Sequence, residues 1–248
     1  MRHLPFLTAA LCGLLLLALA APAQNADEWR NFHTLYVDAV WMRLTGYSSV
    51  QQFTTGVRKG QYGAYLALQN AWADTRGSDA IYQYTTQGVT LTGGLRYWFP
   101  GDQWFAFTSF GHAVAGESKG TDDFRFGAAG FNEWEHGANR VFDLYGDITW
   151  VGAADDLYLT IRAREGVILR QQGNTRWWLY GVGHLAASAS GDNGASNRLE
   201  AGIGLGYRTF KAPFGLSASF ELREGYSYRG TIDDRLFFNP TIIIAGGF

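Results

Sequence analysis

The stretch RLEAGIGLGYR, residues 198–208, decides the fold of this chain. Its odd-numbered positions are apolar, and its even-numbered positions are arginine, glutamate or glycine. A period of two is that of a β-strand with one apolar face. The glycines Gly202, Gly204 and Gly206 lack the spacing of a dinucleotide-binding loop, and the alternation continues through them without opening a helix. The stretch therefore predicts a strand, and we expect no nucleotide site.

The same alternation recurs over residues 89–99, 142–150, 157–164 and 214–223. Segments of about ten residues with one apolar face are typical of transmembrane barrel strands. A secreted β-sandwich also alternates, but its polar face meets water. Here the polar faces carry arginine, acids, tyrosine and glycine, and only three of the twenty basic residues are lysines. We therefore favour an all-β fold, a transmembrane antiparallel up-and-down β-barrel, over the sandwich.

Twelve segments are expected to be strands, an even number as in bacterial single-chain barrels. They are 32–45, 50–59, 62–73, 87–99, 103–114, 123–133, 141–151, 156–170, 175–187, 198–210, 214–227 and 236–248. Short connections such as 60–61 would face the periplasm, and long ones such as 74–87 the exterior. The connection 134–140 is long for a periplasmic turn and 151–156 is short for an outer loop, so ten or fourteen strands stay open as alternatives.

The first residues have the pattern of a cleaved secretory signal peptide. A short basic start is followed by an apolar run over 7–21 and by the tripeptide Ala-Pro-Ala at 21–23. This pattern predicts a signal peptide over residues 1–23 and a single barrel domain over 24–248. Cys12 is the only cysteine of the sequence, so we expect neither a disulfide nor thiol chemistry in the exported protein.

The last strand ends in TIIIAGGF, with Phe248 as the final residue. A terminal aromatic residue after alternating apolar positions resembles the signature by which bacterial outer-membrane barrels are recognised for insertion, although Gly246 departs from it. We therefore predict the outer membrane of a Gram-negative bacterium, with its lipid as one partner. The formal net charge of −2 argues against a nucleic-acid partner.

Little in the sequence indicates catalysis. The five histidines show no metal-binding spacing, so we expect no metal and no cofactor. His184 lies near Ser188 and Ser190, and paired acids such as Asp122-Asp123, Asp155-Asp156 and Asp233-Asp234 fall in expected loops. These features leave an outer-membrane hydrolase as an alternative, but serines and acids at loops ordinarily serve turns. We expect a protein that is not an enzyme.

The polar faces of the later strands predict a charged lumen. The expected lumen-lining residues are Asp143, Tyr145, Asp147, Tyr158, Arg162, Arg164, Arg198, Glu200, Arg208, Glu221 and Arg223. One interpretation is a structural network, because charges inside a narrow barrel must be paired. The other is a glycan path, in which aromatic rings stack on sugars while arginine and aspartate bind hydroxyl groups.

Four stretches carry a resemblance to a known family: DLYGDITWVG (143–152), LYLTIRAREGVILR (157–170), WLYGVGHLAAS (178–188) and NRLEAGIGLGYR (197–208). They are similar to the C-terminal barrel domain of the phage-adsorption protein A family, which is related to the barrels of cellulose and poly-N-acetylglucosamine export proteins. The resemblance covers roughly 140–248.

What this resemblance implies is a pore or exit element for a secreted or surface polysaccharide. The family members carry long N-terminal helical repeats, whereas here the signal peptide leads directly to strands. A periplasmic helical-repeat protein would then supply the scaffold as a separate partner. The first alternative is a non-conducting structural or surface-binding barrel, such as a phage receptor.

Overall fold

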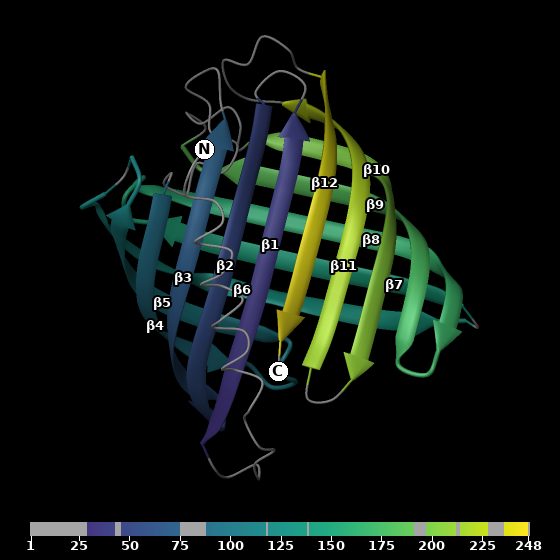
Figure 1. Ribbon diagram of the computed structural model, residues 1–248, viewed down its shortest axis with the longest axis horizontal. Helices are drawn as coiled ribbons and strands as arrows, with labels where there is room; N and C mark the ends of the chain where they lie inside the picture. The colour runs from purple at the N-terminus through teal and green to yellow at the C-terminus, as the bar shows by residue number, and fades with distance from the viewer. Residues whose placement is uncertain are drawn as a thin grey trace.

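The computed structural model describes residues 29–42, 46–74, 88–117, 119–137, 139–190, 197–211, 214–227 and 236–247. These residues form one closed antiparallel barrel, in which each strand pairs with its neighbours in sequence and β1 pairs with β12. Figure 1 shows β1 and β12 side by side at this closure. The expected signal peptide and Phe248 lie outside the described residues. In the described ranges, no helix is long and apolar enough to cross a membrane.

The twelve strands have the following bounds: β1 Arg30–Met42, β2 Gly46–Lys59, β3 Tyr62–Asp74, β4 Gly88–Trp98, β5 Trp104–Ala115, β6 Asp122–His136, β7 Arg140–Val151, β8 Asp156–Gln172, β9 Thr175–Ser188, β10 Arg198–Lys211, β11 Phe214–Ser227 and β12 Leu236–Gly247. The predicted number of strands is confirmed, and ten or fourteen are excluded. The largest single shift of a boundary inside the sheet is at 50–59, where β2 begins four residues earlier.

The connection expected at 134–140 proved to be mostly strand. β6 continues to His136 and β7 begins at Arg140, which leaves a turn over 137–139. Trp134 and Phe142 stack across the two strands, with ring centroids 5.4 Å apart. Cross-strand aromatic pairs of this kind stabilise a ladder, so the strands continue where the sequence suggested a loop.

The two ends of the barrel differ in the length of their connections. At the end where β1 begins and β12 ends, the connections have two to five residues, as at 60–61 and 173–174. At the opposite end the connections 43–45 and 152–155 have three and four residues, 116–121 has six, and the longest are 75–87, 189–197 and 228–235. Outer-membrane barrels have short periplasmic turns and long outer loops, so we place the first end in the periplasm and the second outside the cell.

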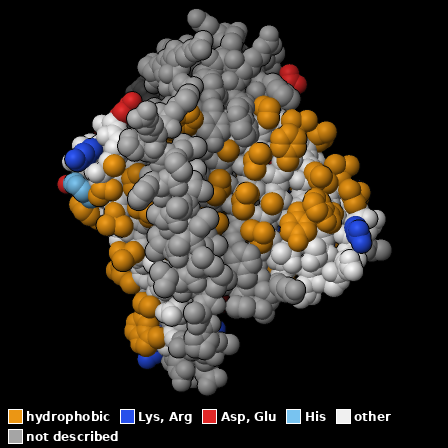
Figure 2. All heavy atoms as spheres, viewed as in Figure 1, with side chains coloured by type: hydrophobic (Ala, Val, Ile, Leu, Met, Phe, Trp, Pro, Cys, Tyr) orange, Lys and Arg blue, Asp and Glu red, His pale blue; other side chains and the backbone are white. Residues whose placement is uncertain are grey.

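The outer face of the barrel is apolar. Leu66, Leu95, Leu199 and Ile203 each leave more than half of their side chain exposed, at 58%, 60%, 56% and 61%. Figure 2 shows hydrophobic side chains spread widely over the outer surface in this view. A surface of this kind would aggregate in water but matches the acyl chains of a bilayer. The protein is thus built to lie in the outer membrane, with lipid around it.

The inward glycines of β10 make room for aromatic rings of β9. A Cβ atom on Gly206 would lie 2.4 Å from Cζ2 of Trp178, and one on Gly204 would lie 2.5 Å from Cζ of Tyr180. Both rings are almost fully buried. Only a residue without a side chain can sit beneath these rings, so the three-glycine pattern of the sequence marks a packed wall of the lumen, with its space already filled.

Candidate functional site in the barrel lumen

The lumen has two unlike parts. We call "packed half" the ion pairs and rings carried mainly by β7 to β11, and "open half" the cavity lined mainly by β1 to β8. The open half has a volume of about 610 Å³. β7 and β8 contribute to both halves, because some of their inward side chains line the cavity and others form ion pairs in the packed half.

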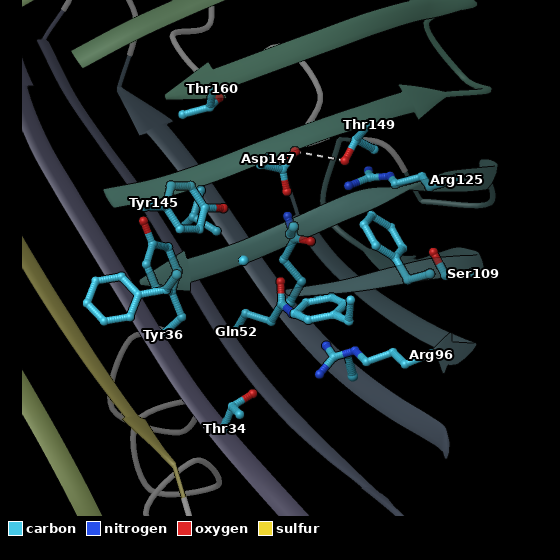
Figure 3. Close-up of a pocket in the computed structure, with 18 of the residues that line it drawn as sticks. Thr34, Tyr36, Gln52, Arg96, Ser109, Arg125, Tyr145, Asp147, Thr149 and Thr160 are labelled. Carbon is cyan, nitrogen blue, oxygen red and sulfur yellow. Dashed lines mark hydrogen bonds between the residues drawn. The ribbon is translucent and has the colours of Figure 1, made fainter. Parts of the chain in front are cut away.

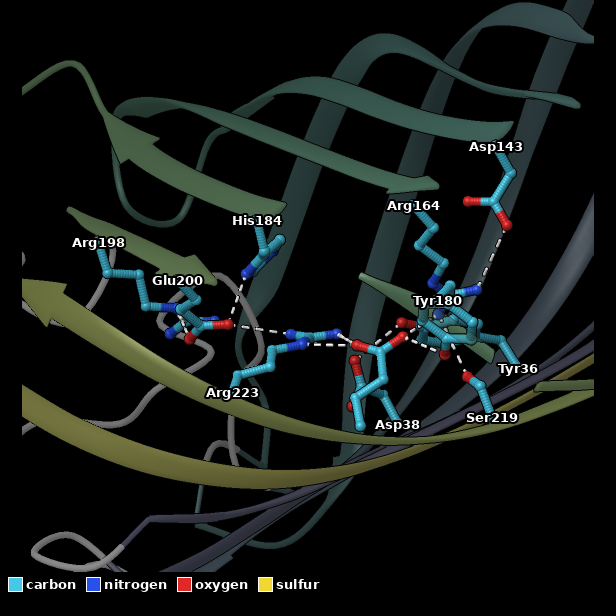
Figure 4. Close-up of polar contacts among 11 residues, drawn as sticks. Tyr36, Asp38, Asp143, Arg164, Tyr180, His184, Arg198, Glu200, Ser219 and Arg223 are labelled. Carbon is cyan, nitrogen blue, oxygen red and sulfur yellow. Dashed lines mark hydrogen bonds and ion pairs between the residues drawn. The ribbon is translucent and has the colours of Figure 1, made fainter. Parts of the chain in front are cut away.

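The centre of the packed half is Glu221, whose side chain is 0% exposed. Its carboxylate forms ion pairs with Arg164 and with Arg223, whose Nε lies 2.6 Å from Oε2. Tyr180 donates its hydroxyl to Oε1 at 2.9 Å. Arg164 also faces Asp143, with 3.7 Å between Nη1 and Oδ2. Figure 4 shows these groups as one chain of contacts across the lumen.

The chain of contacts continues toward the outer end through Glu200. This carboxylate accepts from Arg223 Nη1 at 3.0 Å and pairs with Arg198 Nε at 3.0 Å. It also faces His184 Nδ1 at 2.9 Å. Buried charges are tolerated when they are paired and hydrogen-bonded. Because five strands contribute to this chain, the network ties one side of the barrel together.

A second cluster lies at the periplasmic end of the packed half. Glu133 of β6 forms ion pairs with Arg176 of β9 and Arg208 of β10. The two guanidinium carbons lie 5.2 Å and 5.7 Å from the ring centroid of Trp178. The indole is 1% exposed, so it fills the space between the two cations and contributes cation–π attraction.

The groups that suggested a hydrolase have structural partners. His184 is engaged by Glu200, while Ser190 Oγ donates to Asp156 Oδ2 at 2.7 Å. Ser188 Oγ accepts from an asparagine amide at 3.3 Å. Within the described residues, no group of three or more His, Cys, Asp or Glu could hold a metal ion.

The acidic pairs that were expected in loops were also candidates for catalysis. Asp122 lies 2.6 Å from His112 Nδ1, and Asp123 pairs with Arg125. Asp155 occupies a turn with a φ of 48°. The pair at 233–234 lies outside the described residues. The acids that the structure describes therefore have contacts expected of turns and strand ends.

The open half extends along the height of the barrel. Near the periplasmic end it is lined by Arg58 and Asp102, and near the outer end by Asp123 and Arg198. In Figure 3, side chains from β1, β2, β4 and β7 project into this space from several sides. A cavity that reaches residues near both ends of the strands has the extent needed for a path through the barrel.

The walls of the open half combine aromatic and hydrogen-bonding side chains. The aromatic residues include Tyr36, Tyr65, Trp98, Phe107, Tyr145 and Tyr158. The neutral polar residues include Thr34, Gln52, Gln69, Ser109, Thr149 and Thr160. Rings supply flat apolar area, and hydroxyl and amide groups both donate and accept hydrogen bonds.

Charged residues of both signs also line the open half. Six are arginines: Arg58, Arg96, Arg125, Arg162, Arg198 and Arg223. Four are aspartates: Asp38, Asp102, Asp123 and Asp147. Two pairs combine within the cavity, because Arg58 Nη2 lies 2.5 Å from Asp102 Oδ1 and Arg125 pairs with Asp123. Arg198 and Arg223 pair with Glu200 and Glu221 of the packed half. The other charges of the lining are Arg96 and Arg162 and, of opposite sign, Asp38 and Asp147, so neither sign is in excess.

The structure divides the eleven residues that the sequence assigned to the lumen. Those that line the open half are Tyr145, Asp147, Tyr158, Arg162, Arg198 and Arg223. Those that lie wholly in the packed half are Asp143, Arg164, Glu200, Arg208 and Glu221. The register places Asp143 opposite Arg164 and Tyr145 opposite Arg162, as the sequence order of the two strands suggested.

Sequence analysis missed the half of the cavity wall that comes from the first strands. Arg58, Arg125 and Phe105 line the cavity but were not among the expected residues. Arg96 and Trp98 stood on the polar face of the alternating segment 89–99, and that period was a sufficient signal for their inward direction.

No protein-family model and no curated protein matches this chain. Among solved structures, a bacterial polysaccharide outer-membrane secretin is similar at 6% identity and a TM-score of 0.50, over 91% of this chain and 99% of that one. The β domain of the Bordetella autotransporter BrkA is similar at 12% identity and a TM-score of 0.49, over 90% and 99%. The KdgM porin, in complex with oligogalacturonate, is similar at 10% identity and a TM-score of 0.41, over 87% and 98%. The chain thus shares the barrel fold of outer-membrane proteins and is an outer-membrane β-barrel of a Gram-negative bacterium.

Proposed function

We propose that this barrel is an outer-membrane pore for a saccharide, and that the open half is its path. The observation that carries the proposal is the cavity of about 610 Å³ that extends from Arg58 and Asp102 to Asp123 and Arg198. A barrel that serves only as a structural or surface-binding element has no need for an unfilled space along its height. The packed half, in this proposal, keeps the remaining lumen open by fixing the wall opposite.

The lining supports a saccharide as the cargo. A sugar presents a ring of C–H groups and an edge of hydroxyl groups, which suit an aromatic face and a hydrogen-bonding side chain respectively. The open half offers both along its length: Tyr36 lies opposite Gln52 across β1 and β2, and Tyr145 and Thr149 both line it from β7. Several weak contacts in sequence allow a chain to enter and to leave, which is the requirement for conduction.

The direction of transport that we propose is export of a surface or secreted polysaccharide. The four stretches over 143–208 that resemble the barrels of polysaccharide export proteins support it, and the proposed partner is a periplasmic helical-repeat protein that feeds the chain to the turn end. We propose no catalytic residue, because His184 and Ser190 have the structural partners described above.

The test of the pore is conductance of the purified protein in planar lipid bilayers, together with swelling of proteoliposomes in maltose and maltohexaose. We expect stable current steps and swelling with both sugars. A variant shortened between residues 77 and 85 is measured in the same way. Absence of current in both proteins would show that the barrel is a non-conducting one and would sink the proposal.

The test of export is a strain that lacks this chain. We expect its extracellular polysaccharide to fall and polymer to accumulate in the periplasm, with restoration by the wild-type chain. Unchanged polysaccharide at the surface, in a strain whose purified protein conducts, would reduce the proposal to a pore with another cargo.

A further inference from the structure

We propose that the saccharide taken by the open half is anionic, and that Arg96 and Arg162 bind its carboxylate groups. The inference rests on the proposed function, because it assigns a chemical class to the cargo of the same cavity. It is carried by two guanidinium groups that line the cavity and form no ion pair with a carboxylate within 4.0 Å among the described residues, although Asp143 and Glu221 attract Arg162 from farther away.

Arg96 of β4 is held by aromatic rings. Its guanidinium carbon lies 4.4 Å from the ring centroid of Tyr65, 4.6 Å from that of Phe105 and 5.4 Å from that of Phe32. Rings around a planar cation hold its position but accept no hydrogen bond from its edge. The Nε atom of Arg96 is buried and has no hydrogen-bond partner. The side chain also forms a hydrogen bond with Tyr65, and an acceptor that enters the cavity would satisfy its remaining donors.

Arg162 of β8 repeats the arrangement from another side of the cavity. Its guanidinium carbon lies 5.4 Å from the ring centroid of Tyr145, the residue opposite it on β7. Its Nε is likewise buried without a hydrogen-bond partner. Among the described residues, neither Arg96 nor Arg162 has a carboxylate oxygen within the ion-pair distance of 4.0 Å.

The four aspartates of the cavity have other contacts. Asp102 and Asp123 pair with Arg58 and Arg125, as described. Asp38 Oδ2 accepts the hydroxyl of Tyr36 at 2.9 Å, and Asp147 Oδ1 accepts that of Thr149 at 2.8 Å.

These two arginines lie on strands four places apart in the sheet, β4 and β8. A guanidinium offers a fixed fork of donors that matches the two oxygens of a carboxylate. A neutral sugar hydroxyl offers one acceptor and no charge to such a fork. Three aromatic rings around Arg96 and one beside Arg162 limit the access of water that would screen these charges. A saccharide with carboxylate substituents meets both features, with its rings on the aromatic walls and its charges at the two arginines.

The experiment measures block of the wild-type channel current by two probes of equal length, an oligosaccharide of six uronic acid residues and maltohexaose. We expect the half-blocking concentration of the uronic acid oligomer to be roughly tenfold lower, the discrimination that one charge-assisted hydrogen bond supplies. Substituting Arg96→Gln and Arg162→Gln together should remove this difference. The control Arg170→Gln changes an exposed arginine outside the cavity and should keep it.

A second variant separates charge from shape. Arg96→Lys with Arg162→Lys keeps both positive charges but loses the planar fork, so we expect the reversal potential in a KCl gradient to stay as in the wild-type channel while block by the uronic acid oligomer weakens. Equal block by the two probes in the wild-type channel would overturn the inference, and so would unchanged discrimination in the double glutamine variant.

Binding is also measured without conduction, by quenching of tryptophan fluorescence in detergent, since Trp98 lines the cavity. If the protein carries no current but its fluorescence is quenched preferentially by the uronic acid oligomer, the anionic site is supported and the pore is contradicted. Current without discrimination between the probes would support the pore and overturn the anionic site.

Discussion

The packed half and the open half of the lumen use the same residue types in opposite ways. In the packed half each central carboxylate serves more than one cation, as Glu221 serves Arg164 and Arg223. In the open half Arg96 and Arg162 lie against aromatic rings and lack a carboxylate within reach among the described residues. Pairing fills space and fixes strands relative to one another, whereas stacking holds a cation and leaves its donors available. An arginine in a barrel lumen is therefore a candidate binding residue only where no carboxylate forms an ion pair with it.

The largest effect is expected from breaking the packed half. Substituting Glu221→Gln leaves Arg164 and Arg223 short of a carboxylate in a buried site, and loss of one partner from a buried ion pair costs about 3–5 kcal/mol. Urea unfolding of the refolded protein in detergent measures the change. The matched variant Asp147→Asn removes a carboxylate from the open half, where it accepts from Thr149, and should cost only about 1 kcal/mol. Equal losses would erase the distinction between the halves.

An intermediate effect is expected from filling the glycine sites beneath the rings. Substituting Gly206→Ala would place a methyl group 2.4 Å from Trp178, which is itself held between Arg176 and Arg208. Overpacking of this kind costs typically about 1–3 kcal/mol. Gly183→Ala is the control, because a Cβ there meets nothing within 4 Å. A shift of the unfolding midpoint by Gly183→Ala as large as that by Gly206→Ala would contradict the packed wall.

The smallest effect is expected at the rim of the open half. Asp102 pairs with Arg58 at 2.5 Å, but its side chain is 63% exposed. Exposed ion pairs contribute about 0–1 kcal/mol, so Asp102→Asn should leave the unfolding midpoint almost unchanged. Asparagine also tolerates the left-handed backbone at this position, where φ is 61°. A loss comparable to that of Glu221→Gln would mean that the open half also carries structural ion pairs.

Much of the fold could be predicted from the sequence because an alternation with a period of two fixes the face of the strand on which each side chain lies. Once Leu199, Ile203 and Leu205 face lipid, the pleat sends Glu200 and Arg208 inward, and the structure confirms that direction. The same alternation marked twelve segments as strands, and the structure confirms that number.

The division of the lumen could not be predicted in the same way. Alternation says which side chains point inward, but not which of them meet across the barrel. Glu133 pairs with Arg176 and Arg208, 43 and 75 residues further along the chain. Such contacts depend on the tilt and closure of the sheet, so the sequence left a structural network and a glycan path as two interpretations of one set of residues.

Two serines provide the most direct test of the divided lumen. Ser109 lines the open half, whereas Ser219 accepts from Arg164 in the packed half, and both are 6% exposed. Because Cys12 is the only cysteine of the chain, Ser109→Cys and Ser219→Cys in a Cys12→Ser background each carry one thiol. The measurement is the bilayer current of each variant before and after a negatively charged methanethiosulfonate reagent.

We expect the current through the Ser109→Cys channel to fall on modification, since the added group occupies the path, and the current through the Ser219→Cys channel to stay constant. A fall in current for Ser219→Cys, or a constant current in Ser109→Cys after its thiol has been modified, would contradict the assignment of the open half as the path.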